Sequence, residues 1–253
     1  MIAQLDRQAA GTVIRAGDYW QHSRRPLTSL FFVLPLLVLY EGGVLWLGPA
    51  GVRNGADVWM QQLLGLLGFG GFLLLPLLTI AILLGWHHTS RQPWRVSRGV
   101  LGGMAVESAA LAVLLLVVAD LQARLLALGG QAPVCQLAAG GSATAYASHL
   151  VRYFGAGLYE ELLFRLMLVP LVMAAIGCLV AVRRTQVGVA VVLTSLLFAA
   201  AHYVGPHGEP YQLYSFLFRF VAGGFFALLF IYRGFGIAAG THALYDIFAS
   251  MSA

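Results

Sequence analysis

The chain has 253 residues, of which 60% are hydrophobic and only 10% are charged, and its mean hydropathy is +0.82. This composition excludes an ordinary soluble domain and indicates an integral membrane protein. The formal net charge of +5 comes mostly from arginines that lie between apolar segments, so it indicates membrane topology and we expect no nucleic-acid partner.

Residues 1–27 form a basic N-terminal segment that precedes the first apolar run. The segment contains Arg7, Arg15, Arg24 and Arg25, and it is too long and too mixed for a cleaved signal peptide. We therefore expect it to stay attached, at the cytoplasmic face of the membrane. Residues 1–20 fit either a short helix on the membrane surface, where arginines favour anionic headgroups, or a frayed tail.

A window of about 20 residues finds seven apolar stretches in the chain. They lie near residues 28–47, 63–85, 99–120, 158–182, 187–204, 212–232 and 235–251. The pattern predicts an all-α fold, a polytopic membrane helix bundle of about seven transmembrane helices. Arginines gather in alternate connections, which by the positive-inside rule places the N-terminus in the cytoplasm and the C-terminus outside. We expect a multi-pass protein of a bacterial inner membrane.

A loop at residues 129–142, rich in glycine and alanine, separates two groups of predicted helices. Residues 28–142 would hold the N-terminal transmembrane helices, and residues 143–253 a second transmembrane core. Residues 143–154 look helical, and we expect a break near Gly155 and Gly157 that leaves Glu160 close to a helix start. Cys135 and Cys178 lie in unlike surroundings and predict neither a disulfide nor a metal site.

The most unusual feature of the core is a pair of adjacent carboxylates, Glu160 and Glu161, inside an apolar stretch. Ionised groups in hydrocarbon are costly unless they are paired or face a polar cavity. Glu161 and Arg165 stand four residues apart in the favourable order for an ion pair. Glu160 projects about 100° away around the helix and is free to face another group. The alternative is that both carboxylates only link helices structurally.

Three further ionisable residues lie within predicted spans, namely Glu41, Glu107 and Arg219. We interpret them as packing or interface residues, and Glu107 with Arg219 as a candidate ion pair.

Two later spans contribute His202, and His242 with Asp246 four residues further on. Peptide hydrolysis needs a base for water, a group that holds the water and donors for the oxyanion, and Glu160, His202 and the His242/Asp246 pair match these needs. Two histidines and a carboxylate also match a catalytic zinc site formed by His202, His242 and Asp246. No HExxH motif supports that alternative.

Three short motifs follow one another on successive predicted helices. They are Glu160-Glu161-x-x-x-Arg165, Phe198-x-x-x-His202 and His242-x-x-x-Asp246. In this order they resemble the motifs of the CAAX protease and bacteriocin-processing family. Members of that family are glutamate-dependent intramembrane endopeptidases related to the Ras-converting CAAX endopeptidase, and the resemblance covers residues 143–249.

The resemblance implies a role for each of these side chains. Glu160 would be the general base that activates water, assisted by His202. Glu161 and Arg165 would orient the site, and His242 with the residue four positions later would form the oxyanion pocket. The family pattern usually ends in asparagine, whereas this chain has an aspartate there. An ionised carboxylate cannot donate a hydrogen bond, so this side chain is protonated, orients His242 or ligates a metal.

Two functions from different classes therefore stay open. The first is an intramembrane endopeptidase that cuts a membrane-embedded or membrane-adjacent peptide. We expect this enzyme to need no cofactor, and zinc is the alternative. The second is a non-proteolytic membrane protein, such as an ion or proton pathway or a bacteriocin-immunity factor that acts by binding. The expected partners are membrane lipids and an unidentified peptide or protein substrate. Counting about 1.5 Å per residue places Glu160 and His202 in the outer half of the membrane, whereas family members that act on CAAX proteins work from the cytosol.

Overall fold

Helices account for all the regular secondary structure in the part of the chain that the structure describes. The structure is a computed structural model, and it describes residues 16–48, 52–127, 143–205 and 208–251. The elements in chain order are α2 (Ala16–Ser23), α3 (Pro26–Leu47), α4 (Gly55–Leu66), α5 (Leu74–Thr89), α6 (Arg98–Ala127), α7 (Ala143–Gly155), the π-helical segments η1 (Ala156–Glu160) and η2 (Leu162–Leu168), α8 (Val169–Gly177), α9 (Arg183–Ala201), α10 (Leu213–Arg233) and α11 (Phe235–Met251). The predicted all-α class is confirmed.

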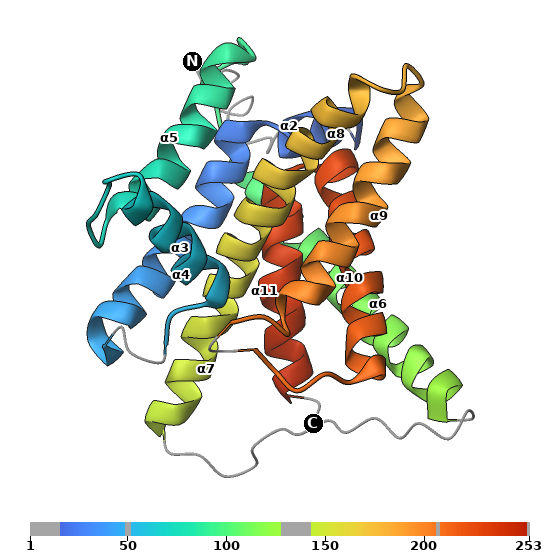
Figure 1. Cartoon of the computed structure of the whole chain (residues 1–253). Coiled ribbons are helices and arrows are strands. Elements are labelled where there is room, and N and C mark those ends of the chain that lie inside the picture. Colours follow the sequence, from blue (N-terminus) through green and yellow to red (C-terminus); the bar gives the residue numbers. More distant parts are fainter. Residues whose placement is uncertain (1–15, 49–51, 128–142, 206–207, 252–253) are drawn as a thin grey trace, which may run out of the picture.

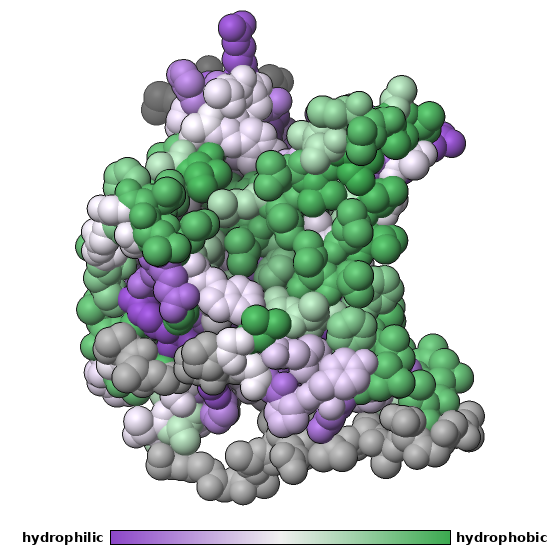
Figure 2. Space-filling view, in the orientation of Figure 1, coloured by the Kyte–Doolittle hydropathy of each residue, from purple (hydrophilic) through white to green (hydrophobic). Residues whose placement is uncertain are grey.

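Several of these helices have the length and apolar surface of membrane spans. Among the described residues, four are long and apolar enough to cross a membrane, namely α3, residues 98–126 of α6, α9 and α10. Apolar side chains cover most of the face seen in Figure 2, and hydrophilic residues gather at its ends and in one patch near α4. The protein is therefore an integral membrane protein, and the number of seven spans stays a prediction.

The second predicted span, residues 63–85, is not one continuous helix. Helix α4 ends at Leu66 and α5 begins at Leu74. Two glycines in the connection, Gly68 and Gly71, have φ values of 84° and 137°, a conformation that side-chain-bearing residues rarely adopt. The prediction of a single helix here was wrong because hydropathy alone does not register this backbone reversal.

The predicted break near Gly155 is also absent. Helix α7 continues through η1 and η2 into α8, and Figure 1 shows this run crossing the whole molecule. Glu160 therefore lies inside a continuous helical segment of π type, a geometry often found at functional sites. The two glycines serve close packing. A Cβ at Gly155 would lie 2.3 Å from the Tyr40 ring, and one at Gly157 would lie 2.6 Å from the Ala243 Cβ.

Helix α11 forms the centre of the bundle and brings its neighbours close to the π-helical segments. Its first half is buried from Phe235 to Ala243, and it packs against α6, α3, α10 and η1. The buried face is rich in glycine and alanine, which allow helix backbones to approach closely. This close approach puts His242 of α11 beside the two glutamates.

The ion pairs between helices differ from the predicted ones. Glu107 of α6 binds Arg233 of α10, with an Arg233 Nη2 to Glu107 Oε2 distance of 2.6 Å, and it also accepts a hydrogen bond from Tyr19. Arg219 instead pairs with Glu209 at 2.7 Å. The predicted pairing of Glu107 with Arg219 was therefore wrong. The two arginines lie at opposite ends of α10, and only Arg233 is level with Glu107.

The N-terminal helix α2 packs against α6 through Tyr19. Residues 16–20 of the predicted interfacial segment are therefore helical, whereas residues 1–15 lie outside the described part. The same holds for Cys135 and for the boundary loop at residues 129–142. Cys178 is exposed, with a free thiol.

Candidate active site

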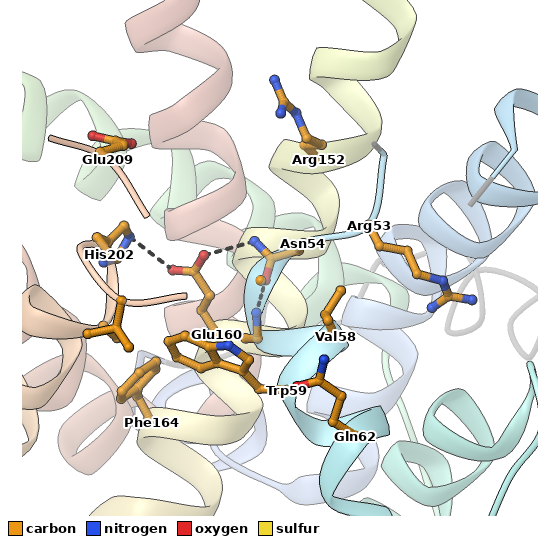
Figure 3. Close-up of a pocket in the computed structure, with 14 residues that line it drawn as sticks. Arg53, Asn54, Val58, Trp59, Gln62, Arg152, Glu160, Phe164, His202 and Glu209 are labelled. Carbon is orange, nitrogen blue, oxygen red and sulfur yellow. Dashed lines mark hydrogen bonds and ion pairs between the residues drawn. The ribbon is translucent and has the colours of Figure 1, made fainter. Parts of the chain in front are cut away.

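Glu160 lies at the centre of the candidate site, and each of its two carboxylate oxygens has a different environment. Oε1 accepts a hydrogen bond of 2.9 Å from Nδ2 of Asn54. Oε2 lies 3.8 Å from Nε2 of His202 (Figure 3) and 3.9 Å from Nε2 of His242. It has no hydrogen-bond partner within the described residues. One oxygen is thus fixed by the protein, while the other faces two imidazoles across a gap too long for a direct hydrogen bond.

His202 stands at the C-terminal end of α9, where its own helix fixes its tautomer. Nδ1 lies 2.8 Å from the main-chain oxygen of Phe198, four residues earlier. A carbonyl oxygen can only accept, so Nδ1 carries the hydrogen and a neutral His202 presents Nε2 as an acceptor toward Glu160. The Phe198 ring contacts the imidazole edge-on at 4.9 Å and limits its rotation.

His242 is oriented by Glu161, whose side chain is fully buried. Nδ1 of His242 lies 2.8 Å from Oε1 of Glu161. The Phe226 ring stacks on the imidazole with centroids 4.5 Å apart and an interplanar angle of 14°. Because the carboxylate accepts the Nδ1 hydrogen, Nε2 of His242 is left to face Glu160 and the space beside it.

Arg165 forms the predicted ion pair with Glu161, at an Nη1 to Oε1 distance of 3.1 Å. The guanidinium also donates to the main-chain oxygen of Gly223 at 3.2 Å and lies over the Phe198 ring at 4.3 Å. Only 1% of the surface of Arg165 is exposed to solvent. Arg165 therefore compensates a buried carboxylate and ties η2 to α10 and α9.

Asp246 lies at the edge of the group. Its Oδ2 is 3.8 Å from Nε2 of His242, beyond hydrogen-bond length, so the bond that orients this imidazole comes from Glu161. In the described part of the chain no three His, Cys, Asp or Glu side chains are grouped so as to hold a metal ion. The arrangement of His202, His242 and Asp246 therefore gives no support to the zinc alternative.

A pocket of about 400 Å³ opens onto Glu160 and His202. Figure 3 shows Trp59 and Phe164 beside the glutamate, Arg152 and Glu209 further from it, and the Arg53 side chain pointing away from it. Aromatic side chains beside a few convergent polar groups are typical of ligand pockets. Glu160 and His202 thus both line a pocket that also contains aromatic and charged side chains.

The sequence reasoning missed Asn54, which comes from the N-terminal half of the chain. Asn54 caps α4, and its Oδ1 accepts from the Ala56 main-chain N–H at 2.8 Å. That bond fixes the amide orientation, so Nδ2 is the group that faces Glu160. The main-chain N–H of Asn54 donates to the Tyr40 hydroxyl at 3.0 Å, and this hydroxyl donates to Asp57 at 2.6 Å. An asparagine before a helical stretch signals an N-cap, but nothing in the sequence reveals its distant partner.

The C-terminal part of the chain is similar to a known protein family. Residues 142–248 match the family described as type II CAAX prenyl endopeptidase Rce1-like. No curated protein and no solved structure matches the chain. The helices from α7 to α11 are therefore similar to those of a CAAX protease family.

The matched segment contains all six residues predicted for the site, and the structure brings them into one cluster around Glu160 and His242. Asn54 and Trp59 lie outside the matched residues and reach the pocket from the α3–α4 region. The family consists of proteases, so its general activity is peptide hydrolysis.

Proposed function

We propose that this protein is an intramembrane endopeptidase in which Glu160 activates water. The observation that carries the proposal is the pair of facing acceptors, Oε2 of Glu160 and Nε2 of His202, 3.8 Å apart. His202 cannot bond Glu160 directly in its neutral form, because its hydrogen is held on Nδ1 by Phe198. A water molecule that donates one hydrogen to each acceptor fits this gap.

The reaction follows from that arrangement. The water oxygen attacks the carbonyl carbon of the scissile peptide bond while Glu160 takes one of its protons. The tetrahedral intermediate then collapses, the C–N bond breaks, and Glu160 returns the proton to the leaving amine. Asn54 keeps Oε1 in a fixed position through its hydrogen bond, so Oε2 stays directed at the water.

His242 is suited to stabilise the oxyanion of this intermediate. In its cationic form it donates Nδ1–H to Glu161 and keeps Nε2–H for the substrate oxygen. Asp246 Oδ2, 3.8 Å from Nε2, makes no hydrogen bond to it and leaves that hydrogen free for the substrate. Arg165 holds Glu161 in place, which makes it a positioning residue. No cofactor takes part in the proposed reaction.

The substrate in this proposal is a peptide segment embedded in the membrane or adjacent to it, and membrane lipids surround the protein. The proposed topology has seven spans in a bacterial inner membrane with the N-terminus in the cytoplasm. Its support is the position of the arginines, which lie near the start of α3, the end of α5 and the start of α9.

The experiment is a turnover assay of the purified protein with a labelled peptide library. Wild-type protein should cleave a subset of the peptides, and Glu160→Ala should cleave none. Asp120→Asn is the matched control, because this exposed carboxylate on α6 only pairs with Arg124 on the surface. Equal cleavage by Glu160→Ala would mean a different base or a contaminating protease. No cleavage by wild-type protein would favour the non-proteolytic alternative.

A further inference from the structure

The two ends of the bundle differ in which connections they contain. At one end Arg24 donates to the main-chain oxygen of Ile231 at 3.2 Å, and the Arg233 guanidinium lies 3.7 Å from the centre of the Trp20 ring. A cavity at this end is lined by Arg24, Trp86, Gly177, Arg183 and Gly234, among others. We call this end of the bundle, at the top of Figure 1, the basic end. It contains the start of α3, the ends of α5, α8 and α10, and the starts of α9 and α11.

The pocket with Glu160 lies toward the other end. Its wall includes Asn54 from the α3–α4 connection, Arg152 from α7, and Val204 and Glu209 from the α9–α10 connection. Helix α9 runs from Arg183 at the basic end to the residue before His202, and its 19 residues span about 28 Å. That length is close to the thickness of the hydrocarbon core of a bilayer, about 30 Å. The pocket mouth and the basic end are thus on opposite sides of the membrane.

Arginines are distributed unequally between these two ends. In the described part of the chain, those at the basic end are Arg24, Arg25, Arg91, Arg95, Arg98, Arg183, Arg184 and Arg233. Those at the pocket end are Arg53, Arg124, Arg152 and Arg219. The first set is twice as large as the second, and the positive-inside rule counts arginines in short connections near span ends. The basic end is therefore the cytoplasmic one.

We infer that the pocket opens on the extracytoplasmic side, and that the substrate is a peptide segment on that side of the membrane. The second half of this inference rests on the proposed peptidase function, and the first half does not. A prenylated C-terminal tail in the cytosol cannot reach Glu160 by this route. The substrate class thus differs from the one that the family description names.

Thiol labelling tests the direction of opening without any need for activity. Cys178 is exposed at the end of α8 and serves as a built-in probe of the basic end. Val204→Cys, in a Cys135→Ala background, adds a probe at the pocket mouth, where 61% of the valine is exposed. A membrane-impermeant maleimide added to spheroplasts should label Val204→Cys and spare Cys178 until the membrane is permeabilised. Gln62 also lines the pocket, so Gln62→Cys in the same background serves as a second probe of it. Labelling of Cys178 alone in intact spheroplasts would overturn the inference, as would failure of both Val204→Cys and Gln62→Cys to react.

A second measurement separates the opening from the chemistry. A cleavable peptide from the library assay is added to right-side-out and inside-out membrane vesicles that contain the wild-type protein. Cleavage should occur in right-side-out vesicles only, and cleavage in inside-out vesicles only would overturn the inference while leaving the peptidase function intact. If labelling gives the expected pattern but the peptide is cleaved in neither type of vesicle, the outward opening of the pocket stands. The inference about the substrate then fails together with the proposed peptidase function.

Discussion

Asn54 and Glu160 are 106 positions apart in the sequence and are joined by a 2.9 Å hydrogen bond across the pocket. The donor comes from a residue that also caps α4, so the same amide serves helix stability and the orientation of Glu160. The two roles can be separated by substitution, because aspartate caps a helix as well as asparagine does but cannot donate when ionised.

Asn54→Asp should keep the cap of α4 but lose most of the activity, because an ionised aspartate cannot donate to Glu160 and places a like charge beside it. The substitution removes a hydrogen bond to a charged group, an interaction of about 1.5–3 kcal/mol, so we expect kcat to fall by about 10-fold to 100-fold. Asn54→Ala should lose similar activity and, in addition, about 1 kcal/mol of stability through the missing cap. Thermal unfolding in detergent and steady-state kinetics measure the two effects. Full activity of Asn54→Asp would mean that Asn54 only caps α4 and does not orient Glu160.

Arg165→Ala should destabilise the fold, because it leaves Glu161 buried without its cation. Breaking a buried ion pair costs about 3–5 kcal/mol. Arg165→Lys should recover only part of the loss, since an ammonium cannot reproduce the contacts to both Glu161 and Gly223. Arg124→Ala, which removes an exposed pair with Asp120, is the control and should cost less than about 1 kcal/mol. Equal unfolding temperatures for Arg165→Ala and Arg124→Ala would contradict the buried pair.

Gly157→Ala should disturb the site through packing alone. The added methyl group would lie 2.6 Å from the Ala243 Cβ and 2.7 Å from the main-chain oxygen of Ala239, next to His242. Overpacking of this kind costs about 1–3 kcal/mol, and it would push η1, which carries Glu160, away from α11. Gly42→Ala is the matched control, because no atom lies within 4 Å of its added Cβ. Unfolding curves of both variants measure the difference, and wild-type stability of Gly157→Ala would be inconsistent with the close contact.

The sequence predicted much of this architecture because membrane helices follow directly from hydropathy. Most apolar stretches became helices, and the Glu161 to Arg165 pair could be read from spacing on one helix. The joint motifs also predicted that Glu160, His202 and His242 belong to one site, and the structure places Nε2 of each histidine within 3.9 Å of Glu160 Oε2.

The features that were missed depend on contacts between distant segments. Asn54 gives no local signal of its bond to Glu160. Glu107 pairs with Arg233 and not with Arg219, because the partner depends on how far along α10 each arginine lies. Gly155 was read as a helix breaker, whereas its small size serves the contact with the Tyr40 ring. Composition and spacing describe one helix at a time, so they do not resolve these contacts.

Asp246→Asn should keep substantial activity. Asp246 Oδ2 is 3.8 Å from His242 Nε2 and makes no hydrogen bond to it, so an amide of the same shape leaves the His242 to Glu161 bond in place. The wild-type enzyme should also be insensitive to chelators, and elemental analysis should find no stoichiometric metal. Loss of activity in Asp246→Asn together with chelator inhibition reversed by zinc would instead make His202, His242 and Asp246 ligands of a catalytic ion.

The most direct test of the account is the turnover of Glu160→Gln in a sample shown to be folded. Glutamine keeps the shape of the side chain and an oxygen that can accept from Asn54, but it cannot take a proton from water. We predict that the variant elutes and unfolds like the wild-type protein in detergent and cleaves peptide at less than about 1% of the wild-type rate, since general-base catalysis contributes about 10²-fold to 10⁴-fold. A folded Glu160→Gln protein that retains more than a few per cent of the wild-type rate would contradict the role of Glu160 as the base.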